Sequence, residues 1–162
     1  MDGPGRELTG LGHDLQLISE LEVAPALREP GVFFTPGELA RFAAAVSPLE
    51  SLAGGFAAKE ALFKALPPAR ATWFWTEAEL VHDPRGAPRF RAHGTLAAHL
   101  DAHRLRVDVS LSHSGGFVSA VVLVTARPPG GGTPLGTLIG FLSRAVGRVL
   151  QRNPAHTSGA PQ

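Results

Sequence analysis

The stretch Phe56-Ala57-Ala58-Lys59-Glu60-Ala61-Leu62-Phe63-Lys64-Ala65-Leu66 organises the rest of this chain. Its spacing predicts a helix, because three apolar residues recur on one stripe at helical intervals. These residues are Leu52, Phe56 and Phe63. Glu60 lies on the same stripe, and a carboxylate that faces a core is costly unless a cation meets it. The sequence therefore predicts a long helix from Pro48 to Leu66 that carries a carboxylate on its apolar side.

Two lysines flank that carboxylate, and they are the only lysines in the chain; the other thirteen basic residues are arginines. Lys64 follows Glu60 by four residues and shares its face, whereas Lys59 is turned by about 100° around the helix axis. One interpretation is a carboxylate that holds a divalent cation beside ammonium groups that meet phosphate. The other is a Glu–Lys pair on a solvated helix face, which is equally compatible with the spacing.

Composition limits the classes of function. The chain has 162 residues, 44% of them hydrophobic, which fits one domain with extensions. A net charge of +1 gives no overall attraction to nucleic acid or membrane. The absence of cysteine excludes disulfides, thiolate metal sites and cysteine nucleophiles. The first residues contain no apolar run and no segment reaches spanning length, so the expected location is the cytoplasm.

The remaining patterns predict an α+β domain over residues 1–126 with an antiparallel sheet. Paired glycines at Gly10 and Gly12 predict that another backbone or a ligand comes close to the first strand. Gly54-Gly55 either weakens the central helix or lets another element pack closely against it. Before the central helix, the expected elements are a strand from Leu8 to Leu15, a weak helix from Leu15 to Leu27, and a helix started by Thr35-Pro36-Gly37-Glu38 with the apolar stripe Leu39, Phe42 and Val46. After the central helix, a hairpin of 79–82 and 88–92 is expected, followed by a helix from Thr95 to His103 that is capped by Thr95. The last expected elements are a strand over 107–112 and a buried strand from Phe117 to Val124.

Three further segments are predicted beyond the domain. Residues 127–133 form a Pro/Gly linker, 134–152 an amphipathic helix with a basic face, and 153–162 a disordered tail. Two roles fit the helix. It folds back over an apolar patch of the domain, which we prefer, or it docks a partner synthase or an anionic membrane surface.

Three motifs resemble those of 4′-phosphopantetheinyl transferases of the single-domain, holo-acyl-carrier-protein synthase type. They are Gly10-Leu11-Gly12-His13-Asp14, the block from Phe56 to Lys64, and Ser110-Leu111-Ser112-His113-Ser114. The resemblance covers roughly residues 8–125. It implies the α+β fold of that family, a homotrimer with sites between protomers, and a partner that is an acyl or peptidyl carrier protein. The implied reaction transfers the phosphopantetheine arm of coenzyme A to a carrier serine, releases 3′,5′-ADP and uses Mg²⁺.

The resemblance also implies roles for individual residues. Asp14 and Glu60 would bind Mg²⁺, Lys59 and Lys64 would contact the phosphates, and His113 would lie near the 3′-phosphoadenosine end. Either Glu60 or a metal-bound water would take the proton of the serine. Taken alone, Asp14 also fits a helix N-cap and His113 a turn histidine.

Departures from the family pattern keep an alternative open. Glu20 stands where a basic residue is usual, Gly55 where an arginine is usual, and Pro67-Pro68 where a glycine-rich loop is usual. The alternative is a catalytically silent relative that acts as a nucleotide-binding or interaction module. Trp73 and Trp75 are predicted to lie in the core or at a protomer contact, with the wall of a pantetheine channel as a second possibility. The sequence does not choose among carriers of fatty acid, polyketide or peptide synthesis.

Overall fold

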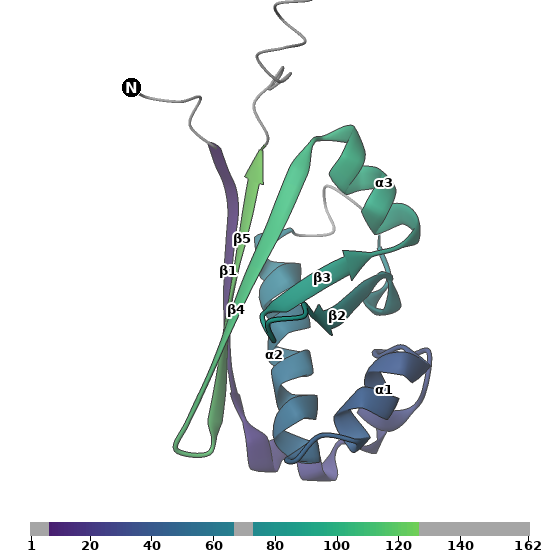
Figure 1. Cartoon of the computed structure of the whole chain (residues 1–162), viewed down its shortest axis with the longest axis vertical. Coiled ribbons are helices and arrows are strands. Elements are labelled where there is room, and N and C mark those ends of the chain that lie inside the picture. Colours follow the sequence, from purple (N-terminus) through teal and green to yellow (C-terminus); the bar gives the residue numbers. More distant parts are fainter. Residues whose placement is uncertain (1–6, 67–72, 127–162) are drawn as a thin grey trace, which may run out of the picture. The chain divides into compact units, whose positions relative to one another are not determined.

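A three-stranded antiparallel sheet packed on one long helix dominates the structure, a computed structural model that describes residues 7–66 and 73–126 (Figure 1). This confirms the predicted α+β class. The elements are β1 (Glu7–Leu17), η1 (Ile18–Val23), η2 (Pro25–Arg28), α1 (Pro36–Ala43), α2 (Pro48–Ala65), η3 (Trp75–Glu77), β2 (Ala78–His82), β3 (Pro88–Ala92), α3 (Gly94–Ala102), β4 (Leu105–Ser114) and β5 (Phe117–Ala126). The predicted linker, amphipathic helix and tail after residue 126 lie outside the described residues.

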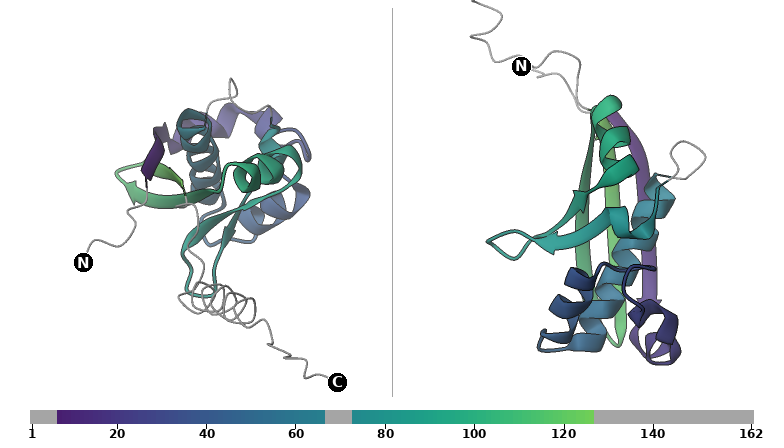
Figure 2. Two further views of the ribbon diagram at one scale, coloured as in Figure 1. Left: turned by 90° about the horizontal axis from the view of Figure 1, so that it is seen from above. Right: turned by 90° about the vertical axis from the view of Figure 1, so that its right-hand side faces the viewer.

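The long sheet has the order β1-β5-β4, so β5 is its central strand. β2 and β3 form a separate hairpin whose turn projects away from the long sheet (Figure 2). The prediction that β5 is buried holds for one face only. Its residues Val118, Ala120, Val122 and Val124 are buried, whereas the alternate residues Phe117, Val121 and Leu123 are exposed. No described element covers this second face of the sheet (Figure 1).

Helix α2 lies directly against β1, and glycines make this approach possible. A side chain at Gly12 would collide with the carbonyl oxygen of Ala61, and one at Gly10 would collide with that of Ala65. The predicted close approach is thus made by the backbone of α2. Close packing at Gly54-Gly55 is confirmed as well, because the rings of Phe34 and Phe42 fill the space beside Gly55.

The face of α2 that meets the sheet consists of small residues, not of the predicted phenylalanine stripe. Its buried positions include Ala53, Ala57, Ala61, Leu62 and Ala65. Phe56 is half-buried and Phe63 is 37% exposed, so the expectation that this stripe faces the core is wrong for Phe63. Alanines allow the sheet to approach the helix axis more closely than phenylalanines would, which turns the larger rings toward the side of the helix.

Some predicted element boundaries differ from the observed ones, because tertiary contacts outweigh local propensity there. The helix predicted over Leu15 to Leu27 is wrong, because β1 continues to Leu17, paired with Phe117, and two short 3-10 helices follow. The Thr35–Glu38 capping box of α1 is confirmed, with Glu38 N donating to Thr35 Oγ1 at 3.1 Å and Thr35 N donating to Glu38 Oε2 at 2.8 Å.

Two predicted helix ends also differ. Helix α1 stops at Ala43, which leaves Val46 fully exposed instead of on its apolar stripe. The N-cap position of helix α3 is His93 and not Thr95, whose hydroxyl donates to Glu77 Oε2 at 2.6 Å. Among the helices of residues 7–66 and 73–126, none is both long and apolar enough to cross a bilayer.

Candidate active site

Asp14, Glu60 and Lys64 meet where β1 passes the C-terminal half of α2. Lys64 Nζ donates to Asp14 Oδ1 at 2.7 Å and to the carbonyl oxygen of His13 at 3.1 Å. The pKa of Glu60 is raised by burial first and by the negative charge of Asp14 second, although the ammonium of Lys64 opposes this. The two carboxylates therefore lie close enough to repel each other, and the structure brings together three of the predicted site residues.

This donor set suits a hard divalent cation. Two carboxylates without a sufficient countercharge are unfavourable together, and a cation between them would relieve their repulsion. Mg²⁺ is commonly held by one or two carboxylates and takes its other ligands from water and substrate phosphate. Lys64, whose side chain is 48% exposed, remains accessible to an anion beside the pair.

Lys59 does not join this group, and its predicted role as a phosphate ligand is wrong. Its Nζ is fully buried and donates to Glu38 Oε2 at 2.9 Å, Phe33 O at 2.9 Å and Trp75 O at 3.0 Å. Burial lowers the pKa of Lys59, while the carboxylate of Glu38 acts in the opposite direction. Since all three ammonium hydrogens have protein acceptors, none is left for phosphate.

The Glu38–Lys59 pair joins distant parts of the fold, a role that the sequence analysis missed. Glu38 also accepts from Leu80 N at 2.9 Å through its other oxygen, so one carboxylate connects α1, α2 and β2. The signal available in the sequence was the turn of about 100° between Lys59 and Glu60, which sends adjacent side chains to different neighbours.

His113 lies on β4 and faces the N-terminal half of α2. Its Nε2 is 4.0 Å from Glu50 Oε1, and it lines a hollow of about 290 Å³. Other residues around this hollow are Arg41, Ser51, Gly54, Gly55 and His82. Gly54, which lines this hollow, and Glu60 are six positions apart on α2, so the directions in which they face differ by about 240° around the helix axis. Because β4 and β1 also occupy opposite edges of the sheet, one copy of the chain does not bring His113 to the carboxylate pair.

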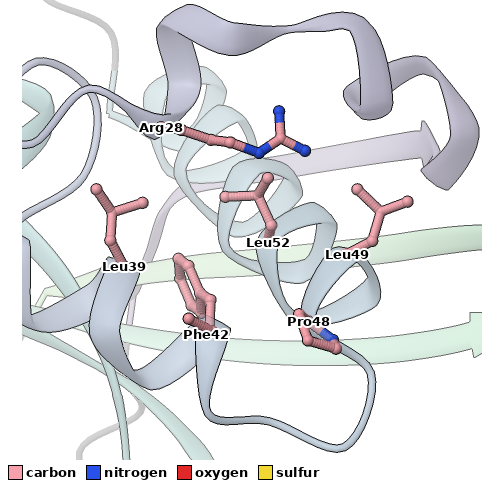
Figure 3. A pocket seen from close by; sticks show the side chains of 7 residues that line it. Arg28, Leu39, Phe42, Pro48, Leu49 and Leu52 are labelled. Atoms are coloured by element: carbon pink, nitrogen blue, oxygen red, sulfur yellow. The ribbon is translucent and has the colours of Figure 1, made fainter.

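Two other hollows differ in chemistry. One, of about 380 Å³, lies between α1 and α2 and is lined by hydrocarbon side chains around Arg28 (Figure 3). The guanidinium of Arg28 donates to the carbonyls of Leu21 and Ala24, so this hollow offers little to a polyphosphate. The other, of about 710 Å³, is lined by Lys64 together with His99 and His103. Their rings lie 4.5 Å apart, and burial and His103 lower the pKa of His99.

Comparison with known proteins gives a consistent result. A family model described as the 4′-phosphopantetheinyl transferase superfamily matches residues 10–122. The holo-[acyl-carrier-protein] synthase of Streptomyces coelicolor is 42% identical over 123 residues, which cover 72% of this chain and 96% of that protein. The synthase of Clavibacter michiganensis is 39% identical over 127 residues, covering 75% of this chain and 99% of that protein.

Solved structures agree with these relatives. The holo-[acyl-carrier-protein] synthase of Neisseria meningitidis matches with a TM-score of 0.63 and 28% identity, covering 74% of this chain and 99% of that one. The synthase of Helicobacter pylori in complex with coenzyme A matches with a TM-score of 0.58 and 26% identity, covering 70% and 98%.

Proposed function

The chain belongs to the 4′-phosphopantetheinyl transferase superfamily and is a holo-[acyl-carrier-protein] synthase, and we propose that Asp14 and Glu60 hold the Mg²⁺ ion of its reaction. The enzyme transfers the 4′-phosphopantetheine arm of coenzyme A to a serine of a carrier protein and releases 3′,5′-ADP. The observation that carries the proposed site is the meeting of two carboxylates and an accessible lysine at the contact of β1 and α2.

The residues present account for the needs of the reaction. The serine oxygen forms a bond to the pyrophosphate phosphorus next to the arm, and the bond from that phosphorus to the leaving 3′,5′-ADP breaks. When bound, Mg²⁺ would supply neutralisation of the pyrophosphate charge. Lys64 is placed to donate to a phosphate oxygen, and such transfers depend mainly on positioning and charge neutralisation. Glu60, whose pKa burial raises, is our candidate acceptor for the serine proton.

The direct test is the mass of a carrier protein. We expect a purified apo carrier protein, incubated with this enzyme, coenzyme A and Mg²⁺, to gain the mass of one phosphopantetheine group on its serine. A chelator should prevent the gain. We propose carriers of fatty acid or polyketide synthesis as the partners, so both belong in the assay beside a peptidyl carrier. Unmodified carriers of all three kinds would contradict the proposal and favour the silent relative.

We propose that the enzyme is a homotrimer in which His113 of one copy meets the carboxylate site of the next. One support is the open face of the sheet, defined by Leu11, Leu15, Phe117, Val121 and Leu123, which are each between 37% and 60% exposed. The register places Leu11 beside Leu123, so this face is continuous, and an apolar face of this kind marks an interaction site. The other support is the position of His113 across α2 from Glu60.

Light scattering at micromolar concentration should give the mass of a trimer. Val121→Glu should produce monomers and abolish transfer, because a charge in the middle of a buried interface is costly. Val46→Glu is the matched control, since Val46 is fully exposed on a loop away from the sheet. A monomeric wild-type protein with full activity would refute both the trimer and the shared site.

The segment after residue 126 extends beyond the matched family region, and we propose that it is separable from the transferase domain. Truncation after Arg127 should leave transfer to a free carrier protein largely intact and should change solubility or binding to vesicles of anionic lipid. An unfolded truncated protein would place the segment in the core instead. A truncated protein that matches the full chain in both transfer activity and binding to vesicles would contradict a docking role. The cytoplasm stays the proposed location on the sequence grounds given above.

A further inference from the structure

Two histidines lie one turn apart at the end of α3. His99 belongs to the last turn of the helix, and His103 follows it at the C-cap position. The helical hydrogen bond between them is formed, since His103 N donates to the carbonyl oxygen of His99 at 3.1 Å. Residues four apart on a helix share one face, and here the two ring centroids are 4.5 Å apart with the ring planes inclined by 45°. The backbone therefore holds the two imidazoles side by side.

Both imidazoles line the hollow of about 710 Å³. His103 is exposed and His99 is half-buried, so solvent and ions can reach the pair. Within residues 7–66 and 73–126, no hydrogen bond occupies either ring, whereas the ring of His13 is bonded to Ser119 and that of His93 to Glu79. Among the described residues, the ring nitrogens of the pair are therefore open to an added ligand.

The pair has the chemistry of a transition-metal ligand set. Burial and the neighbouring His103 lower the pKa of His99, which favours the neutral imidazole that binds a metal. Histidines at positions i and i+4 of a helix can bind one Zn²⁺ ion together. Imidazole nitrogen suits Zn²⁺, Cu²⁺ and Ni²⁺, whereas Mg²⁺ prefers oxygen ligands. The pair would therefore select a different class of cation from Asp14 and Glu60.

We propose that His99 and His103 form a second cation site, which binds a divalent transition metal such as Zn²⁺. The two imidazoles supply two ligands, and water in the hollow supplies the others. In the part of the chain that the structure describes, no third metal-ligating side chain joins the pair. Structural zinc sites are closed by four protein ligands, so a site with two is open and binds its metal reversibly.

Calorimetric titration of the full chain with Zn²⁺, in a buffer that contains excess Mg²⁺, tests the site. We expect the wild-type protein to bind Zn²⁺. His99→Gln and His103→Gln should each weaken this binding at least about tenfold, because losing a group that only orients a metal ligand already costs that much. The fold of both variants is checked by circular dichroism. Cu²⁺ on the wild-type protein should show nitrogen hyperfine splitting in its electron paramagnetic resonance spectrum, and the double variant should lose this splitting.

His82→Gln is the matched control, because His82 is an exposed histidine outside the pair. It should bind Zn²⁺ like the wild type. Asp14→Asn should also keep Zn²⁺ binding, which separates this site from the carboxylate pair. A wild-type protein that binds no Zn²⁺, or histidine variants that bind it as tightly as the wild type, would overturn the proposal. A larger loss in Asp14→Asn than in either histidine variant would overturn it too and assign the zinc to the carboxylates.

Discussion

Asp14→Asn and Glu60→Gln are each expected to lower kcat/KM for phosphopantetheine transfer by at least about 10³-fold, because charge stabilisation of the reacting group is the largest contribution to such catalysis. Each substitution keeps the shape of the side chain and removes one of the two charges that we propose hold Mg²⁺. The fold should survive Glu60→Gln, since a carboxylate whose pKa is raised by burial gains little from being charged in the folded protein. It should survive Asp14→Asn as well, because that change removes only a partly exposed ion pair with Lys64. Transfer is measured by the mass of the carrier protein and the fold by circular dichroism.

A second measurement separates metal binding from catalysis. Millimolar Mg²⁺ should raise the melting temperature of the wild-type protein, because a ligand that binds only the folded state stabilises it. The rise should disappear in both variants. Asp101→Asn, an exposed carboxylate on α3, is the control and should keep both activity and the Mg²⁺ response. Near-wild-type turnover of either site variant at low Mg²⁺ concentration would contradict the metal assignment.

Lys59→Met is expected to lower the free energy of unfolding by about 3–5 kcal/mol, the usual cost of leaving one member of a buried ion pair without its partner. The carboxylate of Glu38 would lose its partner in a fully buried place, and the carbonyls of Phe33 and Trp75 would lose their donor. Lys64→Met, by contrast, should cost no more than about 1 kcal/mol, because its ion pair is partly exposed, but it should greatly reduce transfer. The two lysines of this protein therefore have opposite expected phenotypes.

Denaturant unfolding followed by tryptophan fluorescence measures the difference, with Trp73 and Trp75 as the only tryptophans. The double variant Glu38→Gln with Lys59→Met should recover part of the lost stability, because it removes the unpaired buried charge. If Lys59→Met unfolded like the wild type and yet lost transfer, the buried pair would not be structural and a role at the phosphates would return.

Local sequence patterns determined many of the helices, strands and turns of this protein. The capping box at Thr35 predicted the start of α1, the turn residues 83–86 predicted the hairpin, and helical spacing predicted α2 to within one residue of its end. The glycines of β1 predicted a close backbone approach, which explains why Asp14 can reach Lys64. These features depend on hydrogen bonds and side-chain directions within a few residues, which is the range that local sequence encodes.

Only the tertiary structure determined which residues each side of α2 contacts. Lys59 and Lys64 differ by about 140° around the same helix, and one is buried on Glu38 while the other stays accessible beside Asp14. That outcome depends on segments far away in sequence, since the burial of Lys59 requires α1 and the Trp75 carbonyl. The ring contacts among Phe33, Phe56, Phe63, Trp73 and Trp75 and the open face of the sheet have the same origin. Their members come from distant segments, and chain periodicity carries no information about which segments meet.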